Sequence, residues 1–219
     1  MKKLLVVLIS IFIFCGCSRH VIKYDIDDTN IKWDKNHILA IKDFKDIRPI
    51  EEKEGGSDKF LKFASKDEHF KNPITQSLDE VLKEEFTNID IHVLDYEDDN
   101  PADCHYVLSG NINHFQAAVK LPTVTMVPYL GSVAGVWTKD QFIIAIEIDV
   151  LLQDNATGQK IMEKTYNFTE DKELPTGLCS LARYSRGFNY KLKLLDAAFS
   201  DVIEDVRNDV VEVIDKNYD

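Results

Sequence analysis

The segment FIIAIEIDVLLQDNATGQKIMEKTYNFT, residues 142–169, decides the fold of this chain. Its first part, Phe142 to Leu152, is a long apolar stretch rich in β-branched residues, which favours a strand. The stretch Asn155-Ala156-Thr157-Gly158 then supplies turn residues, and Gly158 can adopt the positive φ that a tight hairpin turn needs. We interpret Lys160 to Thr169 as the return strand. The segment therefore predicts a long β-hairpin.

The chain closes with a long predicted helix, from about Phe188 to Lys216. Apolar residues recur on it at helical spacing, and charged residues occupy much of the other face. Such a stripe is a core face first and a partner-binding face second. Its members are Leu192, Leu195, Phe199, Val202, Val206, Val210 and Val213, with Ile203 and Ile214 beside it.

The residues upstream of the hairpin predict three more strands and one helix. The strands are His37–Phe44, Ile89–Leu94 and Tyr106–Phe115, the last with Gly110 as a bulge or a close-packing point. A helix is expected from Asn72, as the N-cap, and Pro73, in the first helical position, to about Asn88. Its apolar stripe consists of Ile74, Leu78, Val81, Leu82 and Phe86.

This order of elements predicts the fold class. A strand, a helix, two strands, a long hairpin and a final helix indicate an α+β fold. We expect two helices packed on one mixed or antiparallel sheet of about five strands, in a single domain spanning residues 37–219.

The N-terminus has the features of an export signal. Two lysines precede an apolar run, Leu4 to Phe14, that is shorter than the roughly 20 residues needed to span a bilayer. The next residues, Phe14-Cys15-Gly16-Cys17-Ser18, resemble the lipobox of bacterial lipoproteins, with Phe14 in place of the usual leucine. The alternative is an ordinary secretory signal with an incidental cysteine.

The lipobox resemblance implies a specific maturation. Residues 1–16 would be removed as a signal peptide, and Cys17 would receive a diacylglyceryl thioether and an N-acyl chain, which together anchor a protein stably. Residues 17–36 would then be the lipidated cysteine and a tether. Because Ser18 rather than aspartate follows Cys17, the resemblance favours the outer membrane, with the domain facing the periplasm.

The charge balance excludes some partners. The full chain has 38 acidic and 26 basic side chains and a net charge of −12. A surface this negative repels nucleic acid and argues against electrostatic docking on anionic lipid. No P-loop, dinucleotide fingerprint, nucleophile elbow or zinc-binding histidine pair occurs in the sequence. We therefore expect no cofactor, no metal and no enzymatic activity.

Two cysteines remain after Cys15 leaves with the signal and Cys17 takes the lipid. Cys104 and Cys179 form an even pair in an oxidising compartment, so we predict a disulfide between them. The alternative is two separate buried thiols.

The segment from Leu121 to Trp137 is uncharged and apolar, and its two prolines and two glycines argue against a regular helix. One interpretation is an exposed loop that docks on a partner protein or on lipid, because contiguous exposed apolar surface usually marks an interaction site. The other is a crossover buried beneath the long helix. In the first case the contact candidates are Tyr129, Leu130, Val133 and Trp137.

Several weak motifs together resemble the YajG-type family of envelope lipoproteins, and more loosely the auxiliary lipoproteins of ABC-type lipid transporters. They are the Asp46-Ile47-Arg48-Pro49 corner after a strand, the stretch from Ala102 to Phe115 and the turn from Asp154 to Gly158. The apolar segment at 121–137 departs from that pattern. The resemblance implies a non-enzymatic envelope component, and we expect Arg48 to bond Asp46 or loop carbonyls rather than a ligand anion.

The sequence thus predicts a lipid-anchored accessory or adaptor protein in envelope assembly or transport, attached to a membrane through its lipid and to an envelope protein through its surface. The alternative is a periplasmic carrier in which sheet and helices enclose an apolar pocket for a small ligand or lipid. An enzyme is the third and weakest hypothesis.

Overall fold

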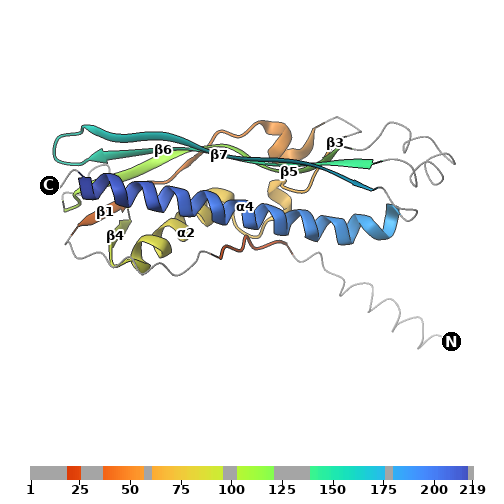
Figure 1. Ribbon diagram of the computed structural model, residues 1–219, viewed down its shortest axis with the longest axis horizontal. Helices are drawn as coiled ribbons and strands as arrows, with labels where there is room; N and C mark the ends of the chain where they lie inside the picture. Colours follow the sequence, from red (N-terminus) through yellow and green to blue (C-terminus); the bar gives the residue numbers. More distant parts are fainter. Residues whose placement is uncertain are drawn as a thin grey trace, which may run out of the picture.

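The computed structural model describes residues 19–25, 37–56, 61–95, 103–120, 139–175 and 180–216. These residues form an α+β fold with two layers, a sheet and two α-helices on one of its faces (Figure 1). The predicted fold class is confirmed. No helix among the described residues is long and apolar enough to cross a membrane.

The sheet contains seven described strands, two more than expected. Five lie in the order β4–β1–β5–β6–β7, and two short strands, β2 and β3, pair with the free parts of β5. Two- and three-residue strands carry no hydrophobic period, so the sequence does not reveal them. The bounds are β1 Ile38–Ile41, β2 Lys45–Asp46, β3 Leu61–Phe63, β4 His92–Asp95, β5 Tyr106–Lys120, β6 Lys139–Asp154 and β7 Lys160–Pro175.

The sheet is mixed. β1 runs parallel to both β4 and β5, whereas β5, β6 and β7 form a long antiparallel ribbon. The predicted hairpin is confirmed as β6 and β7, and Gly158 has φ +68° in its turn. Both strands extend further than predicted, because the ladder continues through their charged ends, from Lys139 to Pro175.

The middle strand, β5, has one irregularity, which lies at Asn113 rather than at Gly110. The register with β6 shifts between Ile112 and His114. An extra residue reverses the side-chain alternation. Ile112 before the bulge and Phe115 after it are therefore both buried in the core. Gly110 is the close-packing point, since a Cβ there would lie 1.9 Å from the carbonyl oxygen of Asp149.

Helix α2, Ile74–Asn88, begins one residue later than predicted. Pro73 is the N-cap, since its carbonyl accepts the hydrogen bond of the Ser77 amide at 3.0 Å. The helix ends in a turn at Asp90, which has φ +66°, and the Ile91 amide bonds the Phe86 carbonyl. This turn explains why β4 begins at His92 instead of Ile89.

Helix α4, Ser180–Lys216, is the longest element and begins eight residues earlier than predicted. Its apolar stripe is confirmed, with Val213 only half-buried. α2 and α4 are joined by a buried ion pair, in which Arg207 Nη1 lies 3.0 Å from Glu85 Oε2. Phe115 of the sheet meets Phe199 of α4 edge-to-face at 5.7 Å between ring centroids. Side chains of the sheet, α2 and α4 thus form one buried apolar cluster between the layers.

Candidate functional site

Residues 19–25, here called the N-terminal strap, lie against the domain. The His20 amide bonds the carbonyl of His69 at 2.7 Å, and the Lys71 amide bonds the carbonyl of His20 at 2.8 Å. His20 Nε2 also lies 2.8 Å from Asp196 Oδ1 of α4, and the Asp25 amide donates to Ser200 Oγ at 3.0 Å. The strap therefore joins α4 to the turn before α2 (Figure 1).

Side chains of the strap add an apolar and an acidic contact. Ile22 and Tyr24 pack against the core. Burial raises the pKa of Tyr24, and a hydrogen bond to Glu84 together with the charges of Glu84 and Glu85 raises it further. The phenol therefore stays protonated and donates to α2. Both helices thus hold the strap.

The strap lies within the range expected to be a tether, residues 17–36. Cys17 itself and residues 26–36 lie outside the described residues. Sequence reasoning missed the docking, because the segment is mostly polar and shows no clear period in the sequence. In the structure His20, Ile22 and Tyr24 are partly buried and alternate with exposed neighbours.

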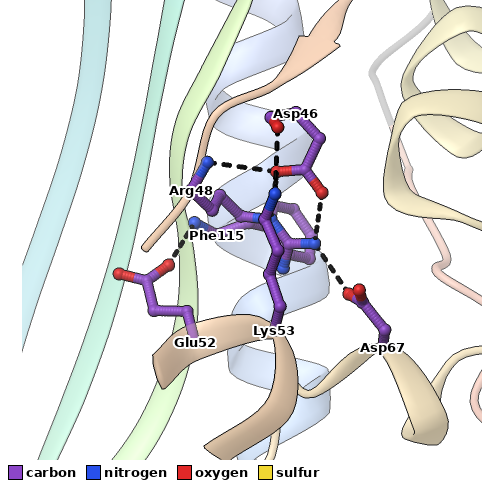
Figure 2. Close-up of polar contacts among 6 residues, drawn as sticks. All are labelled: Asp46, Arg48, Glu52, Lys53, Asp67 and Phe115. Carbon is purple, nitrogen blue, oxygen red and sulfur yellow. Dashed lines mark hydrogen bonds and ion pairs between the residues drawn. The ribbon is translucent and has the colours of Figure 1, made fainter. Parts of the chain in front are cut away.

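The Asp46-Ile47-Arg48-Pro49 corner forms a cluster of polar contacts (Figure 2). Arg48 is 4% exposed. Its Nε and Nη2 donate to both carboxylate oxygens of Asp46, at 3.0 and 2.7 Å, and Nη2 also lies 2.7 Å from Asp67 Oδ1. Lys53 Nζ bonds the Asp46 carbonyl at 2.9 Å. The prediction that Arg48 bonds Asp46 is confirmed.

The charged side chains of the corner compensate one another. Burial alone would raise the pKa of Asp46, but hydrogen bonds and the charge of Arg48, with help from Lys53, outweigh it and lower the pKa. The two carboxylates bond Nε and Nη2 of Arg48, whereas Nη1 is buried and has no hydrogen-bond partner among the described residues. The charge of the guanidinium is thus compensated by Asp46 and Asp67. The chemistry of the corner fixes the chain path between β2 and the loop that follows.

The carboxylate of Glu52 accepts hydrogen bonds from the bulged part of β5. Glu52 is 4% exposed and accepts the Phe115 amide at 3.2 Å and His114 Nδ1 at 2.6 Å. A bulge interrupts the ladder and leaves a backbone amide without its strand partner. The short helix η1, Glu51–Gly55, therefore supplies the acceptor that β6 cannot.

Replacing Arg48 with alanine is expected to lower the free energy of unfolding by about 2 kcal/mol at neutral pH, because hydrogen bonds to charged groups are lost. A lowered folded-state pKa for Asp46 stabilises the fold above the ordinary value of 3.8, and this contribution is lost as the pH falls. The difference between wild type and Arg48→Ala should therefore shrink below about pH 4. Urea denaturation at both pH values measures this, and an unchanged difference would contradict it.

The predicted contact residues Tyr129, Leu130, Val133 and Trp137 lie outside the described residues. The strands on either side of that segment are hydrogen-bonded neighbours, with Lys120 of β5 opposite Gln141 of β6. The segment thus links adjacent antiparallel strands.

The predicted disulfide involves one described residue. Cys104 is buried, and burial raises its pKa. Cys179 lies outside the described residues. Pro175 ends β7 at the far end of the ribbon from Tyr106, since Pro175 pairs with Lys139 while Tyr106 pairs with Asp154. A disulfide needs Cα atoms within about 7 Å, and because Cys179 is not among the described residues the pairing stays a prediction.

The face of the sheet opposite the helices carries a polar groove of about 630 Å³. Asp149, one of its lining residues, accepts hydrogen bonds from Asn113 at 2.9 Å and from Thr165 at 2.6 Å, and Asn113 also donates to Glu147 at 3.0 Å. Charges of both signs line it, among them Lys42, Lys45, Asp43 and Glu163. Among the described residues, no three potential metal-ligating side chains are grouped.

A solved structure shares this fold. A Xanthomonas campestris protein of the family described as DUF330 matches with a TM-score of 0.54 and 12% identity, over 92% of this chain and 98% of that one. Weaker matches are a Helicobacter pylori protein described as a neuraminyllactose-binding hemagglutinin homolog (TM-score 0.41, 12% identity, 79% and 89% covered) and an Acinetobacter baumannii minor lipoprotein (0.35, 14%, 84% and 95%). At these identities the likeness shows the fold alone. No family model and no curated protein matches the chain, so the YajG-type resemblance stays a prediction.

Proposed function

We propose that this chain is a lipid-anchored, non-enzymatic envelope lipoprotein that acts as an accessory or adaptor in envelope assembly or transport. The observation that carries the proposal is the N-terminal strap. It begins two residues after the candidate lipid-bearing Cys17 and is held by α4 and by the turn before α2.

The strap ties the anchor to one place on the domain. Cys17 stands three positions before His20, and an extended chain of three residues spans at most about 11 Å. A lipid on Cys17 would thus hold the domain close to the membrane beside Asp196 and Phe70. We propose that the lipid lies in the outer membrane and that the domain faces the periplasm, because Ser18 rather than aspartate follows Cys17.

Binding rather than catalysis or carriage fits the rest of the described chain. The carrier hypothesis needs an apolar cavity between sheet and helices, but buried side chains of the sheet, α2 and α4 form one continuous cluster there. The groove on the opposite sheet face is lined by residues of both charges, so it could contact a polar surface of a partner protein. We propose that the partner contacts Tyr129, Leu130, Val133 and Trp137, in the segment that links β5 to β6.

The adaptor role is tested by photo-crosslinking in cells, with the photoreactive residue at Tyr129 of the lipidated protein. One discrete protein adduct, identified by mass spectrometry, is the expected result. A matched probe at Thr169, an exposed position of β7, controls for random collision and should give none. The same adducts from both positions, or none from Tyr129, would contradict the docking assignment.

A further inference from the structure

The polar groove on the sheet face opposite the helices is crossed by one row of hydrogen-bonding side chains. Asn111 of β5 is opposite Lys45 of β2 on one side and opposite Asp149 of β6 on the other. Asp149 is in turn opposite Thr165 of β7, and all four residues line the groove. Neighbouring strands lie about 4.8 Å apart, so the row extends over roughly 14 Å at right angles to the strands.

The side chains of the row differ in how much of their hydrogen-bonding capacity the protein itself uses. The Asp149 carboxylate is held in place, because it accepts a hydrogen bond from Thr165 Oγ1 at 2.6 Å. By contrast, the side chains of Lys45 and Asn111 have no hydrogen-bond or ion-pair partner within the described part of the chain. The same holds for Ser109, which also lines the groove from β5. These three side chains can therefore bind a ligand without giving up a contact of the fold.

The kinds of group in the row select for hydroxyl groups. The Lys45 ammonium can only donate hydrogen bonds and the Asp149 carboxylate can only accept them, whereas the amide of Asn111 can do both. An anion has no hydrogen to donate to Asp149, and an ammonium cation cannot accept a hydrogen bond from Lys45. Because a hydroxyl group both donates and accepts, a ligand with several hydroxyl groups can bond every member of the row.

The charge of the groove also favours an uncharged ligand. Its lining includes three lysines and four carboxylates, a net charge of −1, although the whole chain has a net charge of −12. Opposite charges this close together cancel, so neither an anion nor a cation gains much from binding there. The described lining residues include no aromatic and no arginine side chain, which are the usual anchors of a protein partner.

We propose that the polar groove binds a neutral glycan chain through hydrogen bonds between its sugar hydroxyls and Lys45, Asn111 and Asp149. The volume of about 630 Å³ lies within the range of about 300–1,000 Å³ that is typical of ligand sites. Val107 and Leu151, which also line the groove, can contact the apolar faces of the sugar rings. The site needs neither the lipid anchor nor the partner contacts proposed above, so it goes beyond the proposed function.

Saturation-transfer-difference NMR of the mature lipidated protein tests this, in micelles of a detergent whose headgroup contains no sugar. The probes are cellotetraose and chitotetraose, which are neutral, and tetragalacturonic acid, which has a carboxylate on each unit. At least one of the two neutral glycans should bind. The charged glycan should bind roughly tenfold more weakly than that one, because Asp149 and the acidic protein repel it.

A pair of matched variants tests whether the neutral glycan binds in the groove. Lys45→Ala/Asn111→Ala should weaken the binding about tenfold, the effect of losing two hydrogen bonds of ordinary strength. Gln116→Ala/Lys120→Ala removes an amide and an ammonium from the same strand but outside the groove, and should bind as the wild type does. Thermal unfolding at the wild-type temperature shows that both variants are folded.

The outcomes separate this proposal from the adaptor role. No saturation transfer to either neutral glycan would overturn the glycan site, and so would an equal loss of binding in both variants. A photoreactive residue at Ser109 that forms an adduct with a protein in cells would assign the groove to a partner protein instead. Crosslinking from Tyr129 tests the adaptor role by itself, so each proposal can fail without the other.

Discussion

Replacing Arg207 with alanine is expected to lower the free energy of unfolding by about 3–5 kcal/mol, which is the largest effect we predict for one side chain. Arg207 is 2% exposed and Glu85 is 5% exposed, and they pair across the contact of α4 with α2. Alanine leaves the Glu85 carboxylate buried without its main cation. Urea denaturation at neutral pH measures the change.

The pH dependence of this loss follows from Glu85. Burial raises its pKa above the ordinary 4.5, and Arg207 lowers it only in part. A raised folded-state pKa means that the protonated acid favours folding below the ordinary value and that this stability is lost as the pH rises. Without Arg207 the pKa rises further, so the loss should be greatest at neutral pH and smaller below about pH 4.5.

The control for Arg207 is a double replacement. Glu85→Leu with Arg207→Met removes both charges and keeps apolar volume, and such exchanges are often neutral or stabilising. We expect this variant to recover most of the stability lost in Arg207→Ala. A double variant as unstable as the single one would show that the arginine acts by packing, not by neutralising the carboxylate.

Replacing Gly110 with alanine is expected to cost about 3 kcal/mol of stability, the upper end for overpacking. The new methyl group would lie 1.9 Å from the Asp149 carbonyl oxygen and 2.4 Å from Cε1 of Phe44. Phe44 is buried, and the carbonyl belongs to β6, the neighbour of β5. Neither can move without loosening the centre of the sheet.

A second glycine provides the comparison for Gly110. At Gly158 a methyl group would meet no atom within 4 Å, but the φ of +68° disfavours a side chain. Gly158→Ala should therefore cost only about 1 kcal/mol, the price of the left-handed conformation. Both are measured by denaturation of the purified domain. Equal losses would mean that the close approach of β6 to Gly110 is absent.

The regular part of the fold could be predicted because its residues carry a period. The stripes of α2 and α4 and the β6–β7 hairpin each repeat at the spacing of their element, and the structure confirms them. The bulge at Asn113 and the turn at Asp90 could not be predicted, because each depends on one residue and on distant acceptors. Glu52, which bonds the bulge, is 63 residues away from Phe115 in sequence.

The residues of the candidate sites also differ in whether the sequence could predict their contacts. The Asp46–Arg48 pair is local, with only Ile47 between the two residues, so it could be predicted from the sequence. The third member of the corner, Asp67, and the partner of His20, Asp196, are brought in by the tertiary fold.

The lipid on Cys17 is the central claim, and intact mass spectrometry of the protein purified from its own membranes tests it most directly. The account predicts a mature chain that begins at Cys17 and carries a diacylglyceryl thioether and an N-acyl chain, and a Cys17→Ser variant that loses both the lipid and the membrane association. A mature chain with an unmodified Cys17, or one that begins at another residue, would contradict it.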